Sequence, residues 1–237
     1  MSPAAPALGG SEQHMEDDRP VVVVTGMPFE ARIAAGPDVR VVCQQNAGLA
    51  ETLDAVLAQG CRGVVSFGTA GGLVDALRPG TWVVARRVLT DTEYFETHPG
   101  WSKALCRALP GASYGDFAGV PEPVTQVAAK RALHDASGAL VADMESHIVA
   151  RLAAQRALPF VVCRVVIDPA ERSLPEAALA GLRTDGSTDV WAVLCSLARD
   201  PGQLPDLLRL AGDARRARRA MAAGRRLLGR EFAYCRA

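Results

Sequence analysis

The stretch that decides the fold runs from Val141 to Asp168 and reads VADMESHIVARLAAQRALPFVVCRVVID. Apolar residues recur in it at helical spacing and predict a helix over Ser146–Ala157, which Pro159 ends. The apolar run Phe160–Ile167 predicts a strand that is buried on both faces. In an open α/β sheet, ligands bind at the carboxyl ends of the strands. We therefore expect Asp168, directly after this strand, to lie in a functional site.

Strands and helices alternate along most of the chain, which predicts a single α/β domain with a mixed, mostly parallel twisted sheet flanked by helices. The expected strands are Val21–Thr25, Val39–Cys43, Gly63–Ser66, Thr81–Val88, Leu140–Asp143 and Phe160–Ile167. The expected helices are Ala47–Gln59, Val124–Ser137, Ser146–Ala157 and Asp189–Ala198. The 237 residues, 49% of them hydrophobic, suffice for one core.

Two terminal segments differ from this pattern. Residues 1–19 lack periodicity and are expected to be a disordered tail, so the domain is predicted to span residues 20–237. Near the other end, Gln203–Leu228 predicts a basic helix within a segment of about residues 203–230. The turn-rich Ser173–Thr188 predicts a loop beside Asp168.

The composition excludes several classes of function. The chain has 26 basic and 26 acidic residues, and this balance argues against nucleic acid as a partner. Its six cysteines and four histidines show no ligand spacing, so neither a metal site nor a cofactor is predicted. No apolar run approaches about 20 residues, and no signal peptide is recognisable, which predicts a cytoplasmic protein.

Three motifs carry a family resemblance. Asp143–Ser146 (DMES) with the later strand ending in Asp168, and Val64–Leu73 (VVSFGTAGGL), resemble motifs of the nucleoside phosphorylase and nucleosidase superfamily. Val21–Glu30 (VVVVTGMPFE) is similar to the first strand and the Met- and Glu-bearing loop of methylthioadenosine/adenosylhomocysteine nucleosidases, which places Met27 and Glu30 at the site. The motifs follow the family's order along the chain, and the resemblance implies cleavage of a purine N-glycosidic bond.

The resemblance gives roles to individual residues. Asp168 would be the general acid that protonates purine N7, although a carboxylate that caps the next turn is the plain structural alternative. Glu145 would accept hydrogen bonds from the ribose hydroxyls beside an apolar surface from Met144, although this pair alone more often marks an ordinary helix start.

Two interpretations remain for the small residues Gly68–Gly72, which follow the third expected strand. The resemblance places Thr69 near the attacking water or phosphate, and Ala70 and Gly71 beside the base and sugar. On its own, Gly68–Gly72 would be explained by a tight turn between a strand and a helix.

Glu30 distinguishes hydrolysis from phosphorolysis. In the hydrolytic branch the matching Glu positions and deprotonates water, supported by an Arg that matches Arg164. The related phosphorolytic branch carries Arg at the position of Glu30 and a second Arg where this chain has Ser66. A carboxylate repels a phosphate dianion but activates water, so hydrolysis is favoured.

The C-terminal third and the segment from Gly115 to Ser146 resemble bacterial hopanoid-associated phosphorylases, which implies removal of adenine from adenosylhopane to give ribosylhopane. The chain departs from ordinary nucleosidases at Asp168–Ala170 and at Val120–Pro123, where those enzymes place an aromatic beside adenine. The alternatives are a methylthioadenosine/adenosylhomocysteine nucleosidase, a phosphate-dependent purine nucleoside phosphorylase, and a non-catalytic nucleoside-binding protein.

Two expectations concern partners beyond a small-molecule or lipid-linked adenine nucleoside. The resemblance implies a homo-oligomer, a dimer or larger. The arginines of the C-terminal helix suggest peripheral contact with an anionic membrane, while the plainer interpretation is that its apolar stripe packs on the sheet and the arginines are solvated. The stripe consists of Leu207, Leu210, Ala214, Ala217, Met221 and Leu228.

Overall fold

The computed structural model describes residues 19–45, 47–175, 178 and 199–234. The expected disordered tail, except Arg19, and the expected helix Asp189–Ala198 lie outside these residues, as does most of the expected loop Ser173–Thr188. The strands are β1 (Val21–Thr25), β2 (Val39–Cys43), β3 (Gly63–Gly72), β4 (Trp82–Leu89), β5 (Tyr94–Glu96), β6 (Ser113–Gly119), β7 (Val141–Asp143) and β8 (Phe160–Asp168). The helices are α1 (Pro28–Ala34), α2 (Ala47–Leu57), α3 (Pro99–Ala108), α4 (Val127–Ser137), α5 (Ser146–Gln155) and α8 (Leu204–Leu227), with a 3₁₀ turn η1 (Pro201–Gln203) before α8.

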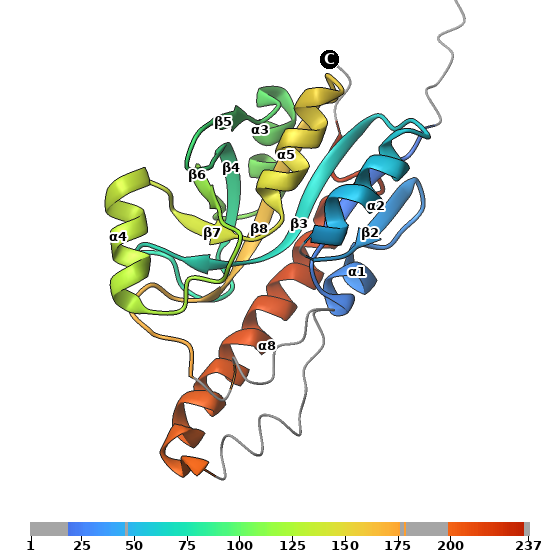
Figure 1. The fold of residues 1–237 in the computed structure, drawn as a ribbon. Helices are drawn as coiled ribbons and strands as arrows, with labels where there is room; N and C mark the ends of the chain where they lie inside the picture. Colours follow the sequence, from blue (N-terminus) through green and yellow to red (C-terminus); the bar gives the residue numbers. More distant parts are fainter. Residues whose placement is uncertain (1–18, 46, 176–177, 179–198, 235–237) are drawn as a thin grey trace, which may run out of the picture.

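All described strands belong to one twisted sheet in the order β2-β1-β3-β7-β6-β4-β5, and β8 pairs with both β3 and β4 (Figure 1). These pairings close a ring, β3-β8-β4-β6-β7-β3. Most ladders are parallel, while β3–β7, β4–β5 and β4–β8 are antiparallel. The predicted mixed, mostly parallel α/β fold is confirmed.

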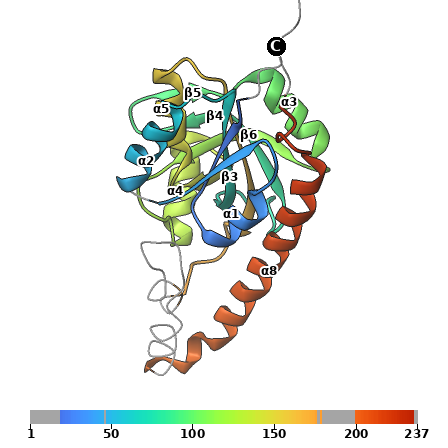
Figure 2. The same cartoon turned by 90° about the vertical axis from the view of Figure 1, so that its right-hand side faces the viewer.

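Helices cover both faces of the sheet. Figure 2 shows the sheet between α2 and α5 on one side and α3 and α8 on the other. The valine run of β1 serves both faces, since Val22 and Val24 pack with α2 and α5 while Val21 and Val23 pack with α3 and α8. Side chains alternate between the faces of a strand, so a continuous apolar run is what a strand in the middle layer requires.

The glycine-rich stretch Gly68–Gly72 corrects one expectation. It was expected to leave the strand at Ser66, either as the family's turn or as a tight connection to a helix, but β3 continues through it to Gly72. The neighbouring β8 supplies hydrogen-bonding partners along this length, and the register shifts between Ala70 and Gly71. Small residues tolerate such an irregularity because they have no bulky side chain that would clash with neighbouring residues.

Helix α8 lies along one side of the sheet, and its first turns extend beyond the sheet in both views (Figures 1 and 2). Its second half packs on the core through the buried residues Ala217 and Met221, which belong to the predicted apolar stripe. Arg225 ties this half to α1 by donating to the carbonyl of Ala34 across 2.9 Å. None of the helices in the described residues is both long and apolar enough to span a bilayer.

Candidate active site

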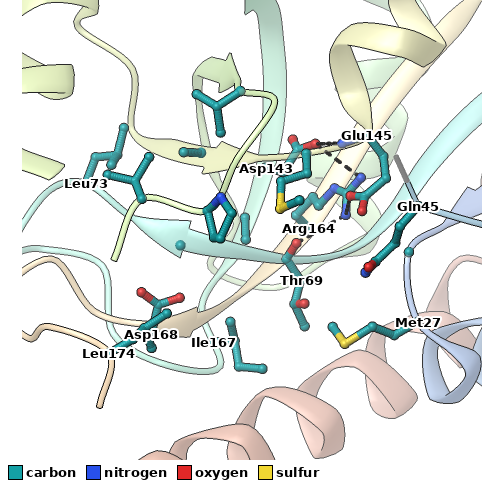
Figure 3. Close-up of a pocket in the computed structure, with 18 of the residues that line it drawn as sticks. Met27, Gln45, Thr69, Leu73, Asp143, Glu145, Arg164, Ile167, Asp168 and Leu174 are labelled. Carbon is teal, nitrogen blue, oxygen red and sulfur yellow. Dashed lines mark hydrogen bonds and ion pairs between the residues drawn. The ribbon is translucent and has the colours of Figure 1, made fainter. Parts of the chain in front are cut away.

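A cavity of about 190 Å³ opens where β1, β3, β7 and β8 end. Its lining includes every residue that the sequence proposed for the site, namely Met27, Glu30, Thr69, Ala70, Gly71, Met144, Glu145, Arg164 and Asp168. Figure 3 shows Asp168 and Leu174 at one end of the cavity and Glu145, Arg164 and Gln45 at the other, with Thr69 and Ile167 between them. The cavity therefore offers a carboxylate at each end.

Glu30 lies at the third position of α1 and is 1% exposed. One of its carboxylate oxygens accepts from the backbone N–H groups of Gly26 and Met27, both at 3.1 Å. The other accepts from Thr69, from the backbone N–H at 2.8 Å and from Oγ1 at 2.9 Å. Thr69 and the start of α1 thus fix Glu30 against β3.

Arg164 of β8 is 1% exposed and lies among several acidic groups. Its Nη1 lies 3.0 Å from Glu145 Oε2, and its Nη2 lies 3.3 Å from Asp143 Oδ1. The guanidinium also donates to the carbonyl of Thr69 at 3.1 Å and to Ser66 Oγ at 2.7 Å. A buried charge is tolerated only when it is paired in this way, so Arg164 organises the acidic end of the cavity.

The loop before α5 orients Glu145. Asp143 Oδ1 accepts from the backbone N–H groups of Glu145 and Ser146, at 2.9 and 2.7 Å. These N–H groups would otherwise lack partners at the start of the helix, and a carboxylate is also favoured there by the helix dipole. The two acidic residues of the motif therefore have different roles: Asp143 accepts hydrogen bonds at the start of the helix, and Glu145 faces the cavity.

The environment changes the acidity of both glutamates. Burial, together with the nearby Asp143 and Glu30, raises the pKa of Glu145 to about 7 against the lowering effect of Arg164. Burial also raises the pKa of Glu30, although Arg164 and the hydrogen bonds from Thr69 and Met27 oppose this. Upward shifts of carboxyl pKa values are common in active sites, where they favour proton transfer.

Two glycines make room for these carboxylates. A Cβ added at Gly26 would lie 2.4 Å from Glu145 Oε1, and a Cβ at Gly68 would lie 2.7 Å from Glu30 Oε2 and 2.8 Å from Arg164 Nη1. A Cβ at either position would force these buried charged groups to shift, so glycine is what lets the backbone approach them so closely.

Asp168 ends β8 and is 7% exposed. It is paired with Lys130 of α4, whose Nζ lies 2.5 Å from Asp168 Oδ2 and which is itself 1% exposed. Burial raises the pKa of Asp168, whereas Lys130 and then Arg172 lower it. Lys130 was not among the predicted site residues, although it lies in the middle of the inward face of α4, between the half-buried Val127 and His134.

Apolar side chains and one amide complete the lining: Leu73, Val120, Pro123, Val124, Ala142, Ile167, Leu174 and Gln45. Within the part of the chain that the structure describes, no three His, Cys, Asp or Glu side chains could together hold a metal ion. The carboxyl groups around this largely apolar lining can form hydrogen bonds and transfer protons.

The sequence pattern of the phosphorylase superfamily matches residues 12–194, which is most of the chain. The chain belongs to the phosphorylase superfamily. No curated protein sequence matches it.

Solved structures with the same fold include the 5′-methylthioadenosine/S-adenosylhomocysteine nucleosidase of S. pneumoniae with a transition-state inhibitor, at a TM-score of 0.60 and 15% identity, covering 88% of this chain and 99% of that one. The corresponding nucleosidase of Colwellia psychrerythraea in complex with adenine has a TM-score of 0.56 and 18% identity, covering 64% and 83%. Futalosine hydrolase of Helicobacter pylori has a TM-score of 0.57 and 16% identity, covering 63% and 88%. At these identities the likeness establishes the fold.

Proposed function

We propose that this superfamily member is a purine nucleosidase, an enzyme that hydrolyses the N-glycosidic bond of an adenine nucleoside. The observation that carries the proposal is the division of one cavity between Asp168 at one end and Glu145 and Arg164 at the other, with Glu30 of the same lining held by Thr69. The purine would lie toward Asp168 and the ribose toward Glu145. Glycosidic cleavage needs these groups, because the leaving base must be protonated while the sugar gains positive charge.

In the proposed reaction, Asp168 gives its proton to purine N7, and the electrons of the C1′–N9 bond leave with the base. Glu30 takes a proton from a water molecule while the oxygen of that water forms a bond to C1′. Glu145 accepts hydrogen bonds from the ribose hydroxyls, and these strengthen as the ring becomes cationic. Met144 and Met27 supply adaptable apolar contacts to the sugar and its 5′ substituent.

Water is the proposed acceptor rather than phosphate. Glu30 is buried and held by four hydrogen bonds, so its carboxylate would face any phosphate bound below the sugar. Arg164, the one arginine in the described lining of the cavity, is engaged by Glu145, Asp143 and Ser66. A dianion in that place would meet a buried like charge, which is unfavourable at low dielectric.

Adenosylhopane is the proposed substrate, with ribosylhopane as the product. The support is the sequence resemblance to hopanoid-associated phosphorylases and the aliphatic lining at Val120 and Pro123, where ordinary nucleosidases place an aromatic. Methylthioadenosine or adenosylhomocysteine is the alternative substrate, because the apolar side chains of Met27 and Ile167 in the lining would suit a thioether as well as an alkyl chain.

A substrate panel tests the proposal. Adenine release is measured with adenosylhopane in detergent, methylthioadenosine, adenosylhomocysteine and adenosine, using wild type and Asp168→Asn. We expect the highest kcat/KM on adenosylhopane and a loss of at least about 10²-fold in kcat for Asp168→Asn with little change in binding. Nucleoside binding without adenine release from any substrate would instead indicate a binding protein.

Two further expectations stay proposals. The family resemblance suggests a homo-oligomer, which light scattering after size-exclusion chromatography measures directly. Contact of α8 with an anionic membrane would bring a lipid-linked substrate to the enzyme. The exposed Leu208 and the arginines Arg215 and Arg219, which have no partner among the described residues, are the features of α8 that favour such contact.

A further inference from the structure

The ammonium group of Lys130 donates all three of its hydrogen bonds to groups of the protein. Besides Asp168 Oδ2, its ammonium donates to the carbonyls of Pro169 at 2.8 Å and Arg172 at 2.9 Å. An ammonium has three N–H donors, so none remains for a ligand in the cavity. Lys130 can therefore influence a reaction only through Asp168 and the loop that follows β8.

The ion pair also fixes which oxygen of Asp168 is available. Oδ2 is held by Lys130, which does not contact Oδ1, and both oxygens lie beside Gly71, where an added Cβ would come within 3.3 Å of Oδ1 and 3.4 Å of Oδ2. Gly71 and Asp168 both line the cavity. One carboxyl oxygen is thus anchored by the lysine, which leaves Oδ1 as the oxygen that would donate the proton in the proposed function.

The other charged groups near Asp168 are few. Arg172, in the loop after β8, lowers the pKa of Asp168 less than Lys130 does. Its guanidinium is paired with the buried Asp213 of α8, which also accepts from Arg216. Lys130 is consequently the cation in direct contact with the carboxylate.

We propose that Lys130 is a positioning residue for the proton donor, one that orients Asp168 and stabilises the carboxylate left after Asp168 has given its proton to purine N7. The inference rests on the proposed function. In this step the O–H bond of Asp168 breaks and the N7–H bond forms, while Lys130 keeps all three of its protons. A stabilised conjugate base makes a stronger acid, which lowers the barrier to departure of the base.

The first test compares Lys130→Met with Lys103→Met, a control at an exposed lysine of α3. Both are assayed on an adenine nucleoside and on 4-nitrophenyl β-D-riboside, whose leaving group departs without a proton. We expect Lys130→Met to lose about 10²-fold in kcat on the nucleoside and less than about threefold on the aryl riboside. The alkaline limb of its pH profile should move upward, since loss of the cation raises the pKa of Asp168. Equal losses on both substrates with an unmoved limb would mean that Lys130 merely anchors the loop.

A double-mutant cycle separates this inference from the proposed function. If Lys130 acts through Asp168, adding Lys130→Met to Asp168→Asn should change the residual turnover by less than about threefold. A full additional loss overturns the inference while leaving Asp168 as the acid. Wild-type turnover in Asp168→Asn alone would overturn the proposed function. Should Lys130→Met fail to fold, Lys130→Gln, which keeps two N–H donors without the charge, takes its place in both tests.

Discussion

Arg164 Nη1 and Glu145 Oε2 lie 3.0 Å apart with both side chains buried, and the same guanidinium reaches Asp143 at 3.3 Å. The arginine thus balances a cluster of carboxylates that includes Glu30, whose charge it also influences. Taking several like charges out of water is costly, and a single buried cation offsets much of that cost. Arg164 is therefore expected to matter both for the stability of the fold and for the arrangement of the proposed site.

The first prediction follows from this pair. Arg164→Met should lower the free energy of unfolding by about 3–5 kcal/mol, because it leaves buried carboxylates without their cation. Urea unfolding monitored by circular dichroism measures the change, with Arg215→Met on the exposed face of α8 as the control. The loss should shrink at acidic pH, where the carboxyls are protonated, and a loss independent of pH would contradict the electrostatic explanation.

The second prediction concerns pH. With the pKa of Glu145 at about 7, its carboxylate form dominates above that pH and is lost as the pH falls. A protonated Glu145 accepts ribose hydroxyls less well, so kcat/KM should decline about tenfold for each unit below the pKa. In Glu145→Gln, kcat/KM should be lower at every pH, and the acidic limb of the profile, the decline below pH 7, should be absent. If the same limb persists in Glu145→Gln, another group is responsible for it.

Gly26 offers a steric test of the site. The Cβ of Gly26→Ala would lie 2.4 Å from Glu145 Oε1, so the carboxylate must move away from the ribose. We expect a loss of about 10²-fold in kcat/KM, since displacements of about 1 Å at reacting groups have such effects. Gly212→Ala is the control, because nothing lies within 4 Å of its added Cβ, and it should leave activity unchanged while stabilising α8 by about 0.5–1 kcal/mol. Unchanged activity in Gly26→Ala would show that Glu145 does not need its observed position.

The membrane proposal has its own test. The enzyme should sediment with vesicles containing anionic lipid, less so as salt is raised, because each arginine near the surface contributes about 1 kcal/mol. The double variant Arg215→Gln/Arg219→Gln should weaken this binding about tenfold or more, and Arg107→Gln/Arg131→Gln, which removes equal charge from other helices, should not. Equal binding by the two variants would assign the effect to overall charge rather than to α8.

The sequence predicted those strands whose residues nearly all favour a strand on their own. The Val-rich β1 and β2 have the predicted bounds, since valine suits strands and the continuous apolar run of β1 suits a strand that is buried on both faces. Strand β6, with the sequence SYGDFAG, was missed because its glycines and aspartate are rare in strands. Its pairing with β4 and β7 outweighs that local preference.

The sequence likewise predicted only those residues of the candidate site that belong to a motif. Glu30, Glu145 and Asp168 follow recognisable motifs, and the structure gathers them around one cavity. Lys130 was not predicted, because a lysine on a helix is ordinarily exposed and its partner is 38 residues away in the sequence. Only the tertiary fold brings α4 against the end of β8.

The most direct test of the central claim is the mass of the sugar product. An adenine nucleoside is incubated with the enzyme in ¹⁸O-labelled water that also contains phosphate, and the ribosyl product is measured by mass spectrometry. Our account predicts a free sugar carrying one ¹⁸O atom at C1, at a rate that phosphate does not change. A sugar 1-phosphate as the main product would contradict the assignment of Glu30 as the base that activates water.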